Sequence, residues 1–316
     1  MGVSASAGHG KPSQIRSRGR RIRSAVTVRP VRTTRRKSVR DVNLSHHIEG
    51  GKDPFFPLSS QLKKERRFLP AQPGPGLHAE DRMKQSLSAL VFDFGGTLDG
   101  PGIAWYERFF VYAQEYAPHV TWKQFLPFVI EAGRALALNE RALSLSLEQT
   151  VEHLVRHVVN QRNPELEGVD ATEITSRFLL DARAHLERSR EVLQALSTDY
   201  RLACISNNWG NAKGWCQDLG FDEYFELVID STLVNVRKPD AKIFQIALEK
   251  MNLPAEKTAY VGDQFVADVL GSKSVGMMSV WLQSNPPKPC PDASKVDWCI
   301  TQIEDLLELK AMPRSS

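Results

Sequence analysis

The stretch "LVFDFGGTLDG", Leu90 to Gly100, is the part of this sequence that decides the fold. Its apolar beginning is typical of a buried strand, and the glycine pair that follows indicates a tight turn. Asp93 stands between the strand and the turn. Because ligands bind at the carboxyl ends of the strands in open parallel sheets, we expect Asp93 to lie where such a sheet binds its ligand.

Strand-like runs recur along the rest of the chain, and helical patterns separate most of them. The predicted strands are residues 88–94, 201–206, 226–230, 258–263, 277–282 and 296–300, and predicted helices include 190–200 and 241–253. This alternation predicts a parallel sheet with helices on both faces. The interval between the first two strands is helical in pattern and too long for a simple crossover. We therefore predict an α/β, Rossmann-like core over residues 85–99 and 187–316, with an inserted all-helical cap over residues 100–186.

The first 84 residues differ from the rest of the chain in composition. Residues 1–40 carry 12 Lys and Arg and no acid, so the remainder has a net charge of −8 within a chain of +4. A sequence so rich in Arg, Ser, Pro and Gly predicts a largely disordered extension, with one short helix over residues 59–69. The acidic body makes nucleic acid an unexpected partner for the core, although the basic tail could contact it weakly.

The role of this extension has four interpretations that the sequence leaves open. It could be an organelle transit peptide, a myristoylated terminus, or a basic arm for nucleic acid or anionic lipid. It could also be a dispensable extension. The four cysteines have no spacing suited to zinc, and Cys204 and Cys299 lie in apolar runs typical of buried thiols. With no apolar run long enough to span a membrane, we expect a cytoplasmic protein, or an organellar one if residues 1–40 are a transit peptide.

Polar residues collect at the predicted strand ends and just before one helix. They are Asp93, Ser206, Asn207, Lys238, Asp263 and Asp268. This set suits phosphoryl transfer, because a carboxylate such as Asp93 can attack phosphorus and hold it as an acyl phosphate. Asp93 and Asp263 could hold Mg²⁺, which offsets the repulsion between the carboxylate and the phosphate. Ser206, Asn207 and Lys238 would bind the other phosphate oxygens. Pro239 could begin the helix that follows Lys238.

Four motifs, "DFGGTL", "ISNN", "RKPD" and "GDQFVAD", resemble in type and order those of the haloacid dehalogenase-like (HAD) superfamily. The resemblance covers residues 88–300 and implies a Rossmann-like core, a helical cap and Asp93 as the nucleophile. It implies Mg²⁺ held by Asp93, the Gly95 carbonyl and Asp263, with Thr97, Ser206 and Lys238 near the phosphate. Asp268 would assist the metal or orient Lys238.

Gly95 departs from the pattern of the superfamily's phosphatases, which usually carry a second Asp at this position as the general acid and base. Losing such a group costs on the order of 10²–10⁴ in rate. Three functions therefore stay open: a phosphatase of a small phosphorylated metabolite, a metal-independent 2-haloacid dehalogenase-type hydrolase, and a catalytically impaired binding or regulatory protein. Asp99, Glu107 or a histidine of the cap could supply the missing acid, although Asp99 in "DGPG" is more typical of a turn residue.

Overall fold

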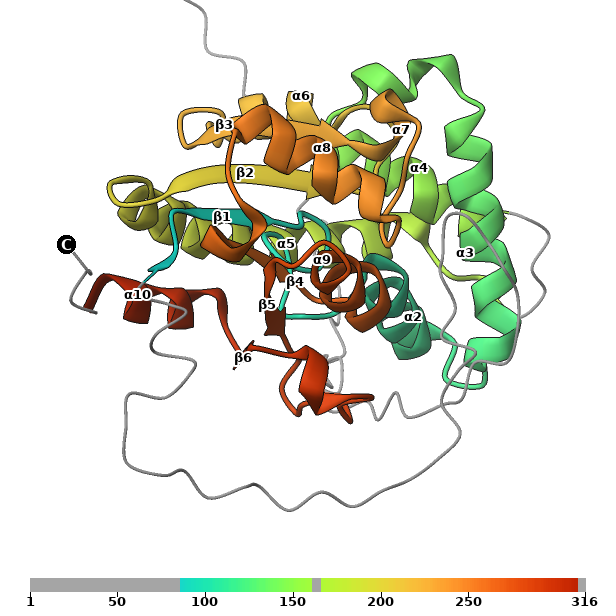
Figure 1. Ribbon diagram of the computed structural model, residues 1–316. Coiled ribbons are helices and arrows are strands. Elements are labelled where there is room, and N and C mark those ends of the chain that lie inside the picture. The colour runs from blue at the N-terminus through green and yellow to red at the C-terminus, as the bar shows by residue number, and fades with distance from the viewer. Residues whose placement is uncertain (1–85, 161–165, 312–316) are drawn as a thin grey trace, which may run out of the picture. The chain divides into compact units, whose positions relative to one another are not determined.

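Six strands form one parallel sheet in the order β3-β2-β1-β4-β5-β6 (Figure 1). They are β1 (Ala89–Phe92), β2 (Arg201–Ser206), β3 (Phe225–Asp230), β4 (Thr258–Gly262), β5 (Met278–Leu282) and β6 (Trp298–Ile300). This computed structural model describes residues 86–160 and 166–311, so the predictions for the N-terminal extension lie outside the described residues. All six predicted strands are present, and the α/β prediction is confirmed.

The strand order places the first strand at the centre of the sheet. Phe92 is in register with Cys204 of β2 on one side and with Val261 of β4 on the other. The chain moves outward from β1 in opposite directions, toward β3 and toward β6. The carboxyl ends of β1 and β4 therefore flank the topological switch point, where open α/β sheets bind ligands.

Both faces of the sheet are covered by helices, as the sequence predicts. Leu90 and Phe92 of β1 point into one hydrophobic cluster, which includes residues of α5 (Ala171–Ser197). Ala89 and Val91 point into a second cluster, formed with α8 (Ala241–Met251). The strand is apolar at every position because both of its faces are buried.

The helices between β1 and β2 form the predicted helical insertion, and Figure 1 shows α2, α3 and α4 gathered beside the sheet. In order they are α2 (Trp105–Tyr116), α3 (Trp122–Ala137), the 3₁₀ helix η2 (Glu140–Ser144), α4 (Leu147–Asn160) and α5. The helix predicted over residues 190–200 is the end of α5, which has 27 residues and ends at Ser197. Because α5 passes residue 186 without a break, the cap boundaries stay a prediction. Among the described helices, none is both long and apolar enough to cross a bilayer.

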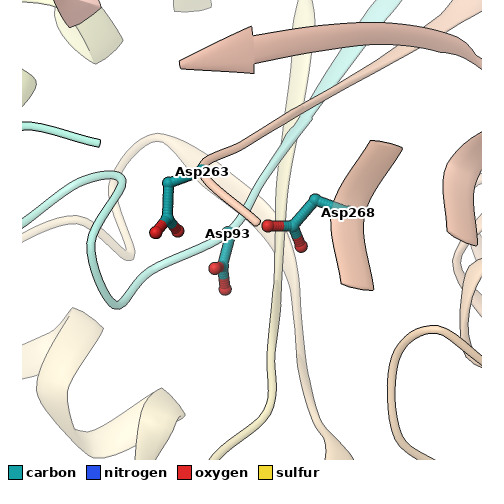
Figure 2. Close-up of side chains that lie close together, drawn as sticks. All are labelled: Asp93, Asp263 and Asp268. Carbon is teal, nitrogen blue, oxygen red and sulfur yellow. The ribbon is translucent and has the colours of Figure 1, made fainter. Parts of the chain in front are cut away.

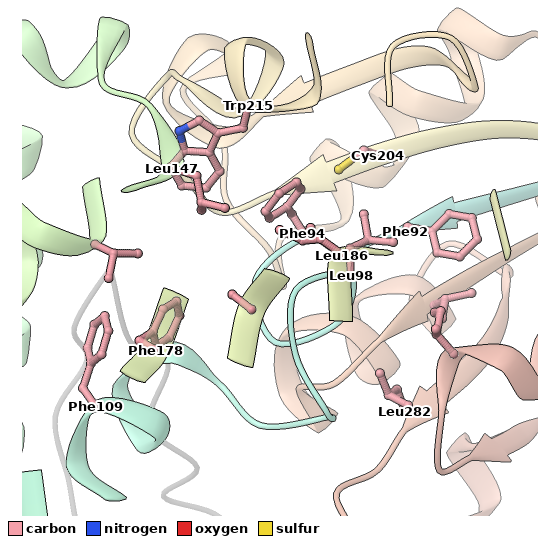
Figure 3. Packing of buried hydrophobic residues seen from close by; sticks show 14 of the residues in the cluster. Phe92, Phe94, Leu98, Phe109, Leu147, Phe178, Leu186, Cys204, Trp215 and Leu282 are labelled. Atoms are coloured by element: carbon pink, nitrogen blue, oxygen red, sulfur yellow. The ribbon is translucent and has the colours of Figure 1, made fainter. Parts of the chain in front are cut away.

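The insertion and the sheet share one hydrophobic cluster (Figure 3). Phe92 and Leu282 come from the strands, Phe94 from the turn after β1, and Phe109 and Phe178 from α2 and α5. Figure 3 labels side chains of this cluster from the strands, the β1 turn and the insertion. The insertion, including α5, is therefore packed against the sheet through one shared apolar cluster.

The remaining elements are short and lie after β2, between the later strands or after β6. They are α6 (Ala212–Asp218), α7 (Ser231–Val234), η4 (Ala255–Lys257), the π-helical turn η5 (Phe265–Leu270), α9 (Gly271–Lys273), η6 (Ala293–Lys295), η7 (Ile303–Leu307) and α10 (Glu308–Ala311).

Two local predictions are wrong. Pro239 does not begin the helix after Lys238, because α8 starts at Ala241 and Asp240 is its N-cap, accepting a hydrogen bond from the Lys242 N–H. Cys204 is buried as predicted, but Cys299 is exposed. Cys299 lies in β6, the edge strand, where alternate side chains face solvent.

Candidate active site

Three carboxylates meet at the carboxyl ends of β1 and β4 (Figure 2). Asp93 directly follows β1, Asp263 directly follows β4, and Asp268 lies in the π-helical turn η5. Each offers an oxygen atom, and these oxygens lie within 4.8 Å of one another. All three side chains are buried, so the fold concentrates negative charge where little water can screen it.

Lys238 supplies the positive charge of this cluster. Its Nζ lies 2.7 Å from Asp93 Oδ1 and 2.7 Å from Asp268 Oδ1, and it donates to the Tyr260 hydroxyl at 2.8 Å. Burial opposes the charge on the ammonium, but Asp268 and Asp93 outweigh it and raise the pKa of Lys238 above its ordinary value. Lys238 is therefore a permanent cation that bridges two carboxylates.

Asn207 positions Lys238 through the backbone. Its side-chain Oδ1 accepts from the Lys238 N–H at 2.9 Å, and its Nδ2 donates to the Lys238 carbonyl at 3.0 Å. Ser206, the preceding residue, is buried at the end of β2 and lines the same pocket. Both predicted residues are thus at the site, with the Asn207 amide already engaged by Lys238.

The turn after β1 is built around Asp263. Gly96 has a φ of +90°, and a Cβ at this position would lie 2.7 Å from Asp263 Oδ2, so both the backbone and the space require glycine. Thr97 donates from its hydroxyl to Asp263 Oδ1 at 3.3 Å. The Thr97 side chain is therefore directed at this carboxylate, next to the position where the resemblance places the phosphate.

The ionisation of the cluster follows from its burial. Burial raises the pKa of Asp93 to about 7, against the stabilising charge of Lys238. Burial also raises the pKa of Asp263 well above its ordinary value, and the neighbouring Asp268 and Asp93 add to this effect. Such groups gain most from a further cation, because it removes both the desolvation cost and the mutual repulsion.

The residues present fit a divalent metal ion. Asp263 Oδ2 is buried and has no hydrogen-bond partner among the described residues, whereas a buried carboxylate oxygen normally has one. Asp93 lies beside it, and oxygen ligands of this kind suit Mg²⁺. Asp268 differs from both, since its Oδ1 contacts Lys238 and its Oδ2 accepts from the Gln264 N–H at 2.8 Å.

A pocket of about 90 Å³ opens above Asp93 and Lys238. Its polar lining also includes Ser206, Asn207, Arg237 and Gln264. Four of its lining residues are aromatic, and we call them the aromatic wall: Trp105, Tyr106, Trp209 and Trp215. Trp209 donates from its indole to the Gly133 carbonyl of α3 at 3.0 Å, which ties the pocket wall to the insertion.

Trp105 lies beside Gly95, the position that departs from the phosphatase pattern. A Cβ at Gly95 would lie 3.2 Å from Trp105 Nε1 and 3.5 Å from its Cδ1. The indole donates to Asp99 Oδ2 at 2.6 Å and stacks on Trp215, with ring centroids 5.6 Å apart at an interplanar angle of 16°. The indole of Trp105 therefore occupies the space beside residue 95, and its position is fixed by Asp99 and Trp215.

Asp99 is a residue whose importance the sequence did not reveal. It is fully buried rather than an ordinary turn residue, and its Oδ1 accepts from the Gly96 N–H at 2.7 Å. Arg108, also fully buried, lies 3.6 Å from Asp99 Oδ1 and donates to Asp181 Oδ2 at 3.1 Å. Asp99 therefore connects the turn after β1 with the start of the insertion.

The histidines of the insertion do not line this pocket. His153 and His157 lie on α4, and His185 on α5 lies 3.7 Å from Asp181 and contacts Arg188. The two other candidates for the missing acid are also engaged elsewhere. Glu107 binds Lys288 at 2.6 Å, and Asp99 holds the indole of Trp105.

A comparison with known protein families finds a match to this chain. The profile of the haloacid dehalogenase-like hydrolases matches residues 87–276, which include β1, the insertion and the carboxylates of the cluster. The chain belongs to this hydrolase family. The resemblance read from the four motifs is thereby confirmed at the level of the family.

Curated relatives of this HAD-like hydrolase include two archaeal proteins named glyceraldehyde 3-phosphate phosphatase. The protein of Pyrococcus abyssi is 40% identical over 32% of this chain and 41% of its own length. The protein of Pyrococcus furiosus is 32% identical over 50% of this chain and 67% of its own length. Among solved structures, a HAD phosphatase from Thermococcus onnurineus is 22% identical, covering 72% of this chain and 100% of its own, with a TM-score of 0.41.

Proposed function

We propose that this HAD-like hydrolase is a Mg²⁺-dependent phosphatase of a small phosphorylated metabolite. The observation that carries the proposal is the position of Asp93, which lines the pocket and lies 2.7 Å from Lys238. It stands beside a buried oxygen of Asp263 that has no hydrogen-bond partner in residues 86–160 and 166–311. The names of the two Pyrococcus relatives support phosphate ester hydrolysis and a small phosphorylated substrate.

Asp93 is the nucleophile in this proposal. One carboxylate oxygen attacks phosphorus while the bond from phosphorus to the substrate oxygen breaks, which leaves an aspartyl phosphate. Water then attacks this phosphorus and releases inorganic phosphate and the Asp93 carboxylate. The Phe94 N–H donates to Asp93 Oδ1 at 2.8 Å and fixes the orientation of the carboxylate.

Lys238 and Ser206 would bind the outer phosphate oxygens, because both line the pocket beside Asp93. The ammonium remains charged, so it stabilises the negative charge that spreads over these oxygens in the transition state. Asn207, which the sequence assigns to the substrate, holds Lys238, and Thr97, which the resemblance places near the phosphate, holds Asp263. We assign both to positioning.

Mg²⁺ would be held by Asp93, Asp263 and the Gly95 carbonyl. The ion would supply electrostatic neutralisation of the attacking carboxylate and the phosphate. Asp268 has both oxygens engaged, by Lys238 and by the Gln264 N–H, so its role here is to orient Lys238 rather than to bind the metal directly. Of the two roles that the resemblance allowed, the geometry favours this one.

The insertion would restrict the substrate to small molecules and exclude water. Its contacts with the core include the indole hydrogen bonds of Trp209 to Gly133 and of Trp215 to Leu145, both at 3.0 Å. The pocket of about 90 Å³ is well below the roughly 300 Å³ of a drug-sized site. Specificity would therefore depend on the aromatic wall and Arg237.

One observation favours a second candidate, a catalytically impaired binding or regulatory protein. Gly95 offers no acid, and Trp105 fills the space beside it. The dehalogenase alternative is less well supported, because that chemistry needs no metal and the Asp263 oxygen fits one.

A direct assay separates these functions. The purified protein is incubated with p-nitrophenyl phosphate, glyceraldehyde 3-phosphate and a panel of phosphorylated metabolites, with Mg²⁺ or with EDTA. We expect phosphate release that requires Mg²⁺ and disappears in Asp93→Asn, which keeps the shape of the side chain but removes the nucleophile. No release from any ester, or release that survives in Asp93→Asn, would contradict the proposal. Halide release from a 2-haloacid in EDTA would support the dehalogenase instead.

A further inference from the structure

The aromatic wall of the pocket lies on the side of residue 95, where the family's phosphatases usually place their proton donor. Trp105 Nε1 is 3.2 Å from the position of a Cβ at Gly95, so even the first atom of a side chain at residue 95 is crowded by the indole ring. The indole cannot take over the task, because its N–H already donates to Asp99 and is not an acid at neutral pH. The pocket thus has an aromatic surface in place of an acid.

Trp105 cannot easily turn aside to admit a proton donor. Its N–H donates to the buried Asp99 at 2.6 Å, and Asp99 is held in turn by the Gly96 N–H and by Arg108. Its ring stacks on Trp215 and meets the edge of Phe178, with ring centroids 5.2 Å apart. Trp105 is therefore fixed beside Gly95 by several contacts. The residues involved come from the β1 turn, α2, α5 and α6.

From this arrangement we propose that the enzyme acts on phosphates whose leaving oxygen needs no proton, namely acyl and aryl phosphates with a planar, delocalised leaving group. This rests on the proposed phosphatase function. When Asp93 attacks phosphorus, the electron pair of the breaking bond departs on the leaving oxygen. A carboxylate carries that charge by delocalisation and stays ionised at neutral pH, and a phenolate carries it until solvent protonates it, whereas an alkoxide requires a proton as the bond breaks.

The aromatic wall suits such leaving groups for a second reason. Trp105 and Trp209 are both partly exposed toward the pocket, and their ring centroids lie 6.4 Å apart at an interplanar angle of 38°. A planar π-system gains from stacking on surfaces of this kind. A polyhydroxylated alkyl chain would instead have to give up water against an apolar wall.

The test is a series of leaving groups measured as kcat/KM with saturating Mg²⁺, because kcat/KM reports the transfer of phosphate to Asp93. The series contains acetyl phosphate, p-nitrophenyl phosphate, phenyl phosphate (leaving-group pKa about 10, as for tyrosine) and two alkyl esters, glycerol 3-phosphate and glyceraldehyde 3-phosphate. We expect kcat/KM to fall steeply along the series, and to be about 10²–10⁴-fold lower for the alkyl esters than for the first two. Values within a few-fold of one another across the series would overturn the inference.

Two sets of variants sharpen the result. Gly95→Asp alone should not raise the rate on alkyl esters, because Trp105 stands in the way, while Gly95→Asp combined with Trp105→Ala should raise it at least 10-fold over Trp105→Ala. Tyr106 also lines the pocket and is the remaining hydroxyl on the aromatic wall. If kcat/KM depends only weakly on the leaving group in the wild type and strongly in Tyr106→Phe, then Tyr106 is the proton donor and the inference is wrong. If no phosphate in the series is hydrolysed, the proposed function itself fails.

Discussion

The amide of Asn207 forms two hydrogen bonds with the backbone of Lys238, one to its N–H at 2.9 Å and one to its carbonyl at 3.0 Å. These bonds join the carboxyl end of β2 to the loop before α8. They set the point from which the Lys238 side chain reaches Asp93 and Asp268. The geometry of the charged cluster therefore depends on a residue that makes no contact with either carboxylate in it.

Replacing Asn207 should lower turnover without removing any charged group. In Asn207→Ala the Lys238 backbone loses both bonds, and a displacement near 1 Å of a catalytic group can cost about 100-fold in rate. We expect kcat to fall by about 10- to 100-fold with a smaller change in KM. Asn139→Ala, which removes an N-cap in the insertion, is the matched control and should leave kcat unchanged. Equal kcat in Asn207→Ala and the wild type would show that Lys238 does not need this support.

Asp263 should control the response of the protein to Mg²⁺. Since its Oδ2 is buried and has no partner within the described part of the chain, Mg²⁺ binding should stabilise the native state and raise the Tm of the wild type. Asp263→Asn should abolish this rise and also remove most activity. The control is Asp240→Asn, because asparagine is as good an N-cap as aspartate for α8. A Tm of Asp263→Asn that still increases with Mg²⁺ would place the metal elsewhere.

The stability of the metal-free protein should depend on pH through Asp93. Its pKa is about 7 in the folded protein against 3.8 ordinarily, so the folded state binds the proton more tightly than the unfolded state. This contribution to the free energy of unfolding is fully present below 3.8 and is lost as the pH rises through about 7. In EDTA, thermal denaturation should therefore give a lower Tm at pH 8 than at pH 5. Asp93→Asn should show a smaller decrease, and an identical decrease would assign the effect to other groups.

The buried pair of Asp99 and Arg108 should matter more for stability than a comparable pair on the surface. Asp99→Asn leaves Arg108 with less compensating charge at a fully buried position, and we expect a loss of about 3 kcal/mol in the free energy of unfolding. Glu226→Gln breaks the exposed pair with Arg201 and should cost less than about 1 kcal/mol. Urea denaturation of both variants gives the comparison. Similar losses would mean that Asp181 alone can balance Arg108.

The sequence was most informative where function depends on the ends of strands. Asp93, Ser206 and Asp263 each follow an apolar run, and parallel strands in register bring such residues to one edge of the sheet. Because this convergence follows from topology alone, the cluster around Lys238 could be predicted without coordinates. The four motifs occur in the order typical of the HAD superfamily, and this order supported the assignment of the individual residues.

The environment of Gly95 could not be predicted in the same way. Asp99 occurs in "DGPG", a composition typical of an exposed turn, and its burial depends on partners from α2. The available signal was weak: Trp105 and Arg108 are three residues apart and so lie on one face of α2, which starts at Trp105. Local pattern shows that they share a face, but not that this face is turned back onto the β1 turn.

The shared hydrophobic cluster of sheet and insertion has a consequence for how this enzyme could change its substrate over evolutionary time. Phe94 and Leu98 of the β1 turn pack in the same cluster as Phe109 and Phe178 of the insertion. An insertion from another family member would have to match this surface before it could bring a new pocket. New specificities in this lineage should therefore arise by single substitutions on the aromatic wall, rather than by exchange of the whole insertion.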